Sequence, residues 1–250
     1  MRKYTVDDIK NFKRDENGYT ICPTGDYTEI KIFDKQCKFG KGCSFYKYCR
    51  FGESCYFGKD CSFGVRCTFS EGCRFDEDCV FGDNCSFDEW CSFGAECRLG
   101  KGCIFYKKCR FGAWCSFGEE CYFGKNCSFG KNCCFDKNCR FDNNCNFNKY
   151  CSFDDECYFD EECRLSGNCN FESGKVKNGK CFVCDRIGNE YRKTYFFCNE
   201  NNEIFIRMGY FFGTEEEFLN QLKGIHEGTK YRKQYISALE IAKEMLKEQK

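Results

Sequence analysis

The sequence predicts a mainly β protein, in which a parallel solenoid of stacked coils is followed by a small α+β domain. Cysteine occupies every sixth position from Cys37 to Cys169, and the residue two places after each cysteine is Phe except at Leu99 and Leu165. Such fixed-period repetition is typical of solenoids, in which stacked units bury a face that one unit cannot bury alone. The period then stops, which divides the chain into a leader, a repeat and a C-terminal domain at residues 1–32, 33–171 and 172–250.

The repeat is compatible with β-strands and not with helices. Six is a multiple of the strand period of two, so Cys and Phe, two residues apart, point to the same side of a strand. The residue between them is mostly polar and points the other way. The residue after Phe is usually Gly, Asp or Asn, which tolerate a positive φ and mark a turn. Each repeat is therefore expected to be a short strand and a bend, with a small Cys and a large Phe inside.

The order Phe, Gly or Asp, two free residues, Cys and one free residue resembles the hexapeptide repeat of left-handed parallel β-helix proteins. Phe stands where that family has an aliphatic residue, and Cys stands where it has another small residue. The resemblance implies three hexapeptides per coil and about seven coils, each rising ~4.8 Å. Eighteen-residue coils predict one interior Phe ladder and one Cys ladder, namely Phe39, Phe57, Phe75, Phe93, Phe111, Phe129 and Phe147, and Cys37, Cys55, Cys73, Cys91, Cys109, Cys127 and Cys145.

The 28 cysteines are interpreted as reduced, packed thiols of a cytoplasmic protein. High cysteine content is otherwise a mark of small secreted disulfide scaffolds. The N-terminal sequence lacks the apolar core of a signal peptide, and disulfide frameworks have uneven rather than periodic spacings. Two alternatives are a metal site and disulfides between neighbouring coils. Ligands repeated along one wall do not converge on a tetrahedral point, and a reducing compartment opposes disulfides.

The leader and the C-terminal domain contain ordinary helix-capping and strand patterns. Thr5 is expected to cap a short helix from Val6 to about Lys13. After the repeat, three stretches read as strands, KCFVCDRI, YRKTYFFC and NEIFIRMGYFF. Thr214 then begins the capping box TEEE of a helix to about Lys223, and a second helix is expected from about Lys230 to Lys247.

The segment GYFFGTEEEFLNQLKGIHEGTKYRKQYISALEIAK resembles a C-terminal module of uncharacterised bacteriophage and prophage proteins. The resemblance implies an origin in a mobile element and a location in the cytoplasm of a bacterial host. It does not imply an activity.

One combination of residues in this domain could bind zinc. Cys181, Cys184 and Cys198 together with His226 would supply a Cys3His ligand set. Residues three apart on a strand face opposite sides, however, so Cys181 and Cys184 would need a knuckle turn to converge. The simpler interpretation is two strand cysteines and a histidine at a helix end, and no cofactor is otherwise expected.

Several large or basic residues interrupt the outward pattern near the middle of the repeat and are predicted to contact a partner protein. Trp90 and Lys108 are eighteen residues apart and should stack on adjacent coils. Exposed aromatic and basic side chains are typical of contact surfaces. The alternative is that these side chains are solvent-exposed residues of a long surface and have no binding role. The predicted contact residues are Trp90, Arg98, Lys101, Tyr106, Lys107, Lys108, Arg110 and Trp114.

Charge and motif content argue against several function classes. The chain has 39 basic and 39 acidic residues, which disfavours nucleic-acid binding by phosphate neutralisation and uniform acidic mimicry of DNA. No apolar run is long enough for a membrane span. The hexapeptide-repeat family that the sequence resembles includes acyltransferases, which use a histidine in the coils. The only histidine here is His226, outside the repeat, so that activity is not expected.

The remaining expectation is a non-enzymatic protein that binds another protein. With the phage resemblance, we expect an inhibitor of a host factor, of the anti-defence or anti-CRISPR type. A structural or assembly scaffold of a virion or another complex is the alternative. The C-terminal domain would serve for docking or for homo-oligomerisation.

Overall fold

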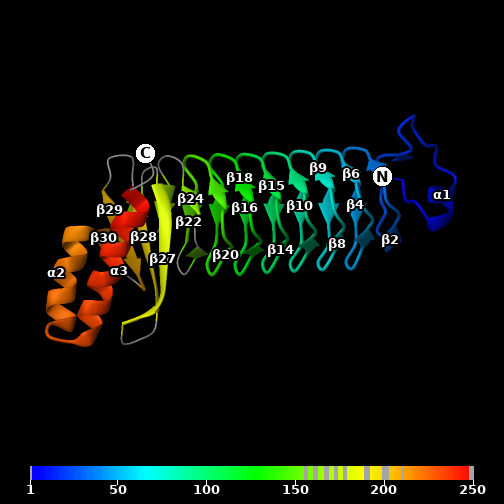
Figure 1. Cartoon of the computed structure of the whole chain (residues 1–250). Helices are drawn as coiled ribbons and strands as arrows, with labels where there is room; N and C mark the ends of the chain where they lie inside the picture. Colours follow the sequence, from blue (N-terminus) through cyan, green and yellow to red (C-terminus); the bar gives the residue numbers. More distant parts are fainter. Residues whose placement is uncertain are drawn as a thin grey trace.

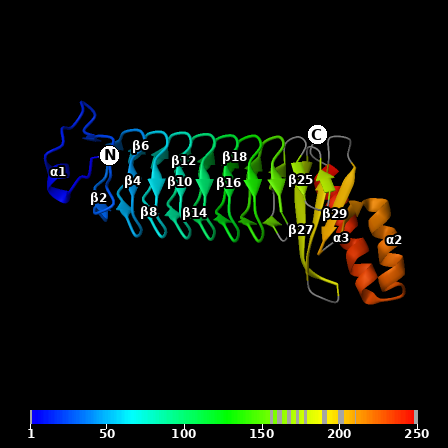
Figure 2. The ribbon, with the colours of Figure 1, turned by 180° about the vertical axis from the view of Figure 1, so that it is seen from behind.

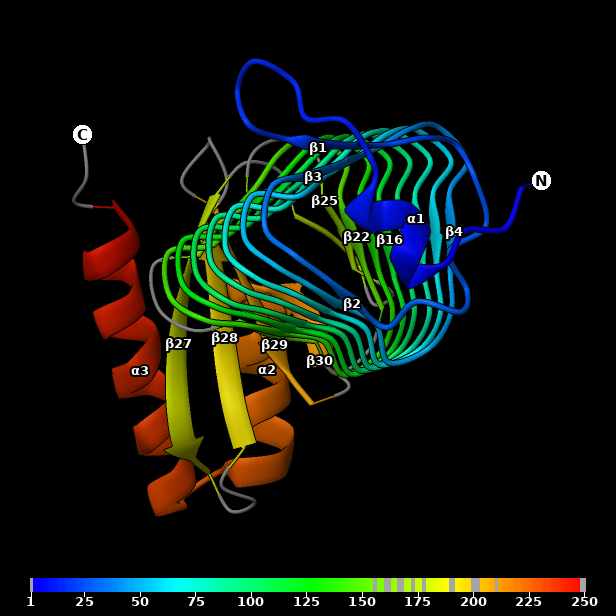
Figure 3. The same cartoon turned by 90° about the vertical axis from the view of Figure 1, so that its right-hand side faces the viewer.

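The computed structural model describes residues 2–154, 157–159, 163–165, 169–171, 174–176, 179–188, 192–198, 203–209 and 211–247. The chain forms a rod of stacked parallel coils, about eight turns long, with a small α+β region at the end opposite the N-terminus (Figure 1). Seen along the rod, the coils superimpose into a three-sided outline (Figure 3). The predicted fold class is confirmed, whereas the left-handed sense of the coil stays a prediction.

Each side of the rod is one sheet. Sheet I consists of β1 (Thr20–Cys22), β3 (Cys37–Phe39), β6 (Tyr56–Phe57), β9 (Arg74–Phe75), β12 (Ser92–Phe93), β15 (Arg110–Phe111), β18 (Ser128–Phe129), β21 (Asn146–Phe147) and β24 (Arg164–Leu165), and continues into β27 (Gly179–Ile187), β28 (Arg192–Cys198), β29 (Ile204–Met208) and β30 (Phe211–Thr214). Sheet II consists of β4 (Ser44–Phe45), β7 (Ser62–Phe63), β10 (Val80–Phe81), β13 (Arg98–Leu99), β16 (Ser116–Phe117), β19 (Cys134–Phe135), β22 (Ser152–Phe153), β25 (Cys169–Phe171) and β26 (Gly174–Val176). Sheet III consists of β2 (Ile32–Phe33), β5 (Arg50–Phe51), β8 (Thr68–Phe69), β11 (Ser86–Phe87), β14 (Ile104–Phe105), β17 (Tyr122–Phe123), β20 (Arg140–Phe141) and β23 (Tyr158–Phe159).

Neighbouring coils pair in parallel with an offset of eighteen residues, as the resemblance to hexapeptide repeats implies. Tyr56 is aligned with Arg74, and Phe57 is aligned with Phe75. The amide of Arg74 donates to the carbonyl oxygen of Cys55 at 2.8 Å. The coil therefore satisfies its backbone through its neighbours, which is why a strand of only two residues persists in the rod.

The interior is a column of phenylalanine rings, and the predicted Phe ladder is confirmed. Rings eighteen residues apart are nearly parallel: Phe69 and Phe87 lie 4.8 Å apart between centroids, with an interplanar angle of 1°. Rings six residues apart meet edge to face, as Phe111 and Phe117 do at 4.9 Å and 88°. Both arrangements are the favoured geometries of aromatic pairs, so each ring gains stacking in addition to burial.

The cysteines contribute a second set of interactions that the sequence did not predict. All register cysteines are buried, and the described cysteine side chains are free thiols. From Cys55 to Cys169, each Sγ donates to the carbonyl oxygen of the residue 21 positions earlier, at 3.3–3.8 Å. The accepting residue is the first corner residue of the previous coil, as Gly52 after Phe51 is for Cys73. A thiol is a small apolar group with a weak donor, so it packs and also pairs a corner carbonyl.

The corner geometry corrects one prediction. Positive φ lies at the third corner residue, directly before the next Cys, as at Glu96 (φ 60°), and not at the residue after Phe. The glycines after Phe are required by close approach instead. A Cβ on Gly52 would lie 2.5 Å from the backbone nitrogen of Lys35 in the adjacent coil. Where Asp stands in this position, its carboxylate accepts from the next amide, as Asp88 does from Glu89 at 2.8 Å.

The N-terminal end of the rod is covered by the leader. The helix α1 (Val6–Lys10) begins after Thr5 with a full capping box, as predicted, and ends three residues earlier than expected. Tyr27 continues the column beyond Phe45, at 5.4 Å, and the Tyr4 ring stacks on Tyr27 at 5.0 Å. The leader thus adds part of a coil to the repeat and closes its apolar end.

The C-terminal region covers the other end. β27 pairs antiparallel with β24, so the last edge of sheet I does not remain open. On β28, Phe197 lies 6.2 Å from Phe159 of the final coil, whereas Phe196 lies 6.4 Å from Phe218 of α2 (Glu215–His226). One side of this antiparallel sheet therefore closes the solenoid and the other supports α2 and α3 (Lys230–Lys247), which Figure 2 shows outermost.

The predicted strands and helices of this region are confirmed with two refinements, one of which is that α2 ends at His226, three residues beyond the expected Lys223. Thr214 forms both bonds of the capping box with Glu217. The third predicted strand is a hairpin of two strands, β29 and β30. In the part of the chain that the structure describes, none of the helices is both long and apolar enough to cross a bilayer.

Candidate functional site

Six of the eight predicted contact residues lie along sheet I or at its two edges. Three consecutive corner residues precede each strand of sheet I, and three more follow it. Trp90 ends the corner before β12, and Trp114 ends the corner after β15, the next strand of the sheet. Arg110 points outward from β15 between these corners. We call this set the Trp surface, consisting of Trp90, Lys108, Arg110 and Trp114.

Trp90 and Lys108 form the predicted stack. They occupy the same corner position in adjacent coils, and Lys108 Nζ lies 4.2 Å from the centroid of the Trp90 ring. Such a cation–π pair contributes about 0.5–1 kcal/mol at an exposed site. The Trp90 side chain is still 46% exposed, so the pair leaves much of the indole open to a partner.

Both tryptophans stand where the backbone disfavours them. Trp90 and Trp114 have φ of 63°, in the left-handed region. A side chain with a Cβ costs roughly 1 kcal/mol in that region compared with glycine. Trp114 is also 62% exposed and therefore gains little from packing. The coil imposes this φ on the last residue of every corner, so the exposed indoles and not their φ set these two corners apart.

The other predicted residues are distributed around the rod. Tyr106 and Lys107 share the corner of Lys108, and Lys107 forms an ion pair with Glu89 at 3.2 Å. Arg98 projects from sheet II. Lys101 lies in the corner between sheets II and III, where it is 3.7 Å from both Glu119 and Glu120. The structure therefore does not bring Arg98 and Lys101 to the Trp surface.

A second group of exposed aromatic residues lies outside the set of predicted contact residues. Tyr46, Lys47 and Tyr48 form one corner near the N-terminal end, and both tyrosines are about half exposed. Lys31 Nζ lies 4.5 Å from the Tyr46 ring centroid, and the Arg66 guanidinium lies 5.9 Å from that of Tyr48. Tyr48 and Arg66 are eighteen residues apart, like Trp90 and Lys108. The sequence signal that could have identified this group is an aromatic residue followed by Lys or Arg eighteen positions later.

The zinc hypothesis rests partly on residues outside the description. The side chains of Cys181 and His226 are not among the described ones. Of the other two, Cys184 is aligned with Thr194 and Cys198 with Ile204. Within the described residues, no three His, Cys, Asp or Glu side chains form a group suited to a metal ion. The Cys3His set stays a prediction.

The buried thiols lack the solvent access that a nucleophile needs. Contacts between thiols of adjacent coils shift their pKa values in both directions: the contact with Cys133, together with burial, raises the pKa of Cys115 to about 12, whereas the contacts with Cys121 and Cys85 lower the pKa of Cys103 to about 4. A nucleophilic cysteine needs a lowered pKa and solvent access. Cys134 is exposed, on the outer side of sheet II.

No family model matches the sequence, and neither the curated proteins nor the solved structures contain a significant match to it. The fold itself defines the class: a parallel β-solenoid with a phenylalanine core, closed at one end by a leader and at the other by a small α+β region. Its surface carries exposed aromatic and cationic side chains on a repetitive frame.

Proposed function

We propose that this chain is a non-enzymatic protein-binding protein and that the Trp surface contacts its partner. The observation that carries the proposal is the pair of exposed tryptophans in left-handed corners at the two edges of sheet I. Trp and Arg are the residues most often found to dominate binding energy in protein interfaces. A stacked coil also holds its corners in fixed positions, which reduces the ordering cost of association.

The more specific form of the proposal is inhibition of a host factor by a protein of phage or mobile-element origin, of the anti-defence or anti-CRISPR type. It draws on the resemblance of the C-terminal sequence to phage and prophage modules. The expected location is the cytoplasm of a bacterial host. An acyltransferase activity is not proposed, because the repeat contains no histidine to act as a base.

Affinity capture tests the binding proposal. The tagged chain is incubated with a bacterial host lysate, alongside the double variant Trp90→Ala/Trp114→Ala. Tyr150→Ala is the matched control, because Tyr150 is half exposed and occupies the same left-handed corner column as Trp114, two coils further on. We expect one stoichiometric partner for the parent chain and the control, and at least about tenfold less for the double variant. Capture of no stable partner would contradict the proposal.

A structural scaffold of a virion or another complex is the alternative, favoured by the stiff rod with both apolar ends covered. Its C-terminal region would then dock or oligomerise, and α3 carries the exposed apolar residues Ile241 and Met245 on one face. Mass spectrometry of purified particles distinguishes the two roles, since a structural component must remain with the particle. Absence from purified virions removes the alternative.

A further inference from the structure

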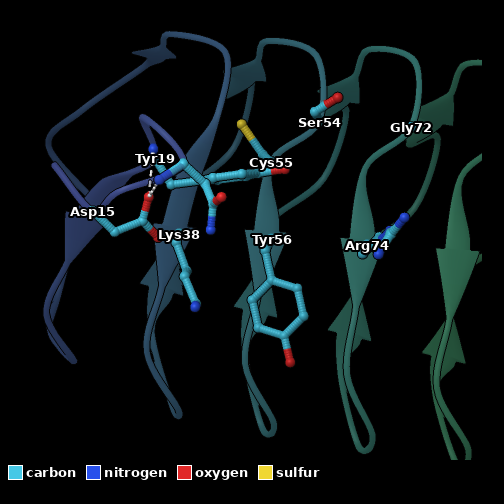
Figure 4. A pocket seen from close by; sticks show the side chains of 9 residues that line it. Asp15, Tyr19, Lys38, Ser54, Cys55, Tyr56, Gly72 and Arg74 are labelled. Atoms are coloured by element: carbon cyan, nitrogen blue, oxygen red, sulfur yellow. Dashed lines mark hydrogen bonds between the residues drawn. The ribbon is translucent and has the colours of Figure 1, made fainter.

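A groove lies at the N-terminal end of sheet I, separate from the Trp surface. The leader turns back over the sheet at residues 13–19, and the space between them has a volume of about 390 Å³. Figure 4 shows Lys38, Tyr56 and Arg74 on three successive strands, with Asp15 of the leader beside them. The volume lies near the lower end of the range for small-molecule sites, enough for a small ligand or two side chains.

The wall formed by the leader is well ordered by its own hydrogen bonds. Asp15 Oδ1 accepts from the amides of Asn17 and Tyr19, at 3.0 and 2.9 Å. The Asp15 amide in turn donates to the carbonyl oxygen of Tyr19 at 2.9 Å, and the Ile21 amide donates to that of Lys13 at 2.8 Å. The groove is therefore preformed rather than dependent on a ligand, which lowers the entropic cost of binding.

The floor is an alternating row of cation, phenol and cation. Lys38 is aligned with Tyr56 and Tyr56 with Arg74 across adjacent coils, so all three point outward from sheet I. The Tyr56 hydroxyl is held by Asp76 Oδ2 at 3.2 Å, which fixes the half-buried ring. Burial and the Asp76 carboxylate both raise the pKa of Tyr56, so the hydroxyl stays protonated at neutral pH.

The charge of the groove favours an anion. Neither Lys38 nor Arg74 forms an ion pair with any described residue, although acids are as abundant as bases in the chain. Among the described residues that line the groove, Asp15 is the only acidic one, and its Oδ1 already accepts from two amides. Arg binds carboxylates through two parallel hydrogen bonds, and Lys adds a point charge.

The spacing of the two cations indicates the length of the ligand. Lys38 and Arg74 lie two coils apart, which is roughly 10 Å along the rod. Acidic side chains at positions i and i+2 of an extended peptide project to the same side, about 6.7 Å apart at their Cα atoms. Their flexible stems can span the remaining distance, and the residue between them points away from the Tyr56 ring. Ser54 adds a hydroxyl at the groove edge.

We propose that this groove binds two carboxylates of an extended acidic peptide segment, one at Lys38 and one at Arg74. The inference does not depend on the Trp surface, since the groove is formed by other coils. It identifies a second contact site, with an acidic strand or tail of a protein as its ligand.

Isothermal titration calorimetry tests the proposal with the full chain and the blocked tripeptide N-acetyl-Glu-Thr-Glu-amide. Lys38→Ala and Arg74→Gln are each expected to weaken binding at least about tenfold, the loss of one charge-assisted contact. Arg164→Gln is the matched control, because Arg164 occupies the same outward row of sheet I five coils beyond Arg74 and lies outside both the groove and the Trp surface. It should bind like the parent chain, and circular dichroism verifies that all variants fold.

Three further ligands test whether the groove requires two carboxylates and whether these must be held apart on a peptide. The tripeptide N-acetyl-Gln-Thr-Gln-amide should bind at least about tenfold more weakly, because it lacks both charges. Glutarate should also bind more weakly than the Glu tripeptide, since its two carboxylates are too close to reach both cations. Inorganic phosphate should not compete with the tripeptide at equal concentration. Equal binding of the Gln and Glu tripeptides, tighter binding of glutarate, displacement by phosphate, or insensitivity to Lys38→Ala and Arg74→Gln would each overturn the proposal.

Discussion

At the scale of single residues, the corner of each coil sets the strongest local constraint. Each corner has three residues, and the last of them has a positive φ in every corner from Gln36 to Tyr150. Among these residues, only Gly42, Gly72 and Gly102 are glycines. Asn, which tolerates this region, occupies several of the others. At the other corners, residues that disfavour a positive φ occupy this position at a conformational cost, which other interactions of the rod must offset.

Replacing one of these residues with glycine should stabilise the protein. Glu96 has a φ of 60° and no ion pair with any described residue. We expect Glu96→Gly to raise the free energy of unfolding by about 0.5–1 kcal/mol, because the strain is relieved. The neighbouring substitution Ala95→Gly lies outside the positive region and should lower it by a similar amount. Thermal and urea unfolding measure both, and a loss of stability in Glu96→Gly would contradict the argument.

The thiol-to-carbonyl bonds give a second residue-scale prediction. Cys115 is fully buried and donates to the carbonyl oxygen of Gly94 at 3.3 Å. Cys115→Ala removes the donor and leaves a small cavity, and should cost about 1–3 kcal/mol. Cys134→Ala is the control on the same sheet, where the thiol is exposed, and should change stability by less than about 0.5 kcal/mol. Equal effects in urea unfolding would show that neither the packing nor the hydrogen bond of the buried thiol contributes to stability.

At the scale of the element, each coil contributes three inward rings, and the column is interrupted at two rungs. Leu99 occupies one of them, aligned with Phe81 on one side and Phe117 on the other. Because rings eighteen residues apart stack at 4.7–5.0 Å elsewhere along the repeat, Leu99 breaks two such contacts. The two-residue strands add little by themselves, so the continuity of the column is a main source of stability.

Restoring the ring should therefore strengthen the rod. We expect Leu99→Phe to raise the free energy of unfolding by about 0.5–1.5 kcal/mol, the typical value of an aromatic pair beyond its burial. The reverse change, Phe117→Leu, should lower it. The midpoint of thermal unfolding reports both changes. A decrease for Leu99→Phe would mean that the coil has closed around the smaller side chain, and the interpretation of the rung as an interruption would be wrong.

At the scale of the whole molecule, the buried thiols whose pKa is raised couple stability to pH. Hydrogen bonding between thiols and burial hold the pKa of Cys97 and Cys115 at about 12, against an ordinary value of 9.0. Between these values the unfolded chain releases protons that the folded chain retains. Stability contributed by each such thiol is complete below pH 9 and is lost as the pH rises toward 12.

The sum over many thiols predicts sharp alkaline unfolding. Each pH unit above 9 costs about 1.4 kcal/mol per thiol whose pKa is raised, whereas thiols whose pKa is lowered, such as Cys61 and Cys103, do not add to this loss. We expect cooperative unfolding between about pH 9 and pH 11, followed by circular dichroism under reducing conditions. Alkylation with a thiol reagent should modify few cysteines at pH 7 until a denaturant is added. A rod that stays folded at pH 12 would contradict the coupling.

The sequence by itself determined the architecture of the repeat, because a six-residue period is incompatible with a helix and places Cys and Phe on one face. It also determined the caps at Thr5 and Thr214. The eighteen-residue pairing, and with it the stack of Lys108 on Trp90, followed from the resemblance to hexapeptide repeats, which have three repeats per coil. These features are local or strictly periodic.

Only the tertiary structure decided which corner residue takes a positive φ, because that depends on how one coil approaches the next. The thiol bonds that cross between coils and the closure of sheet I by β27 likewise join residues whose proximity no local pattern encodes. The same holds for the candidate surfaces. Arg98 and Lys101 are near Trp90 in sequence but face other sides of the rod, whereas the leader and Arg74 meet at the groove because the chain folds back over sheet I.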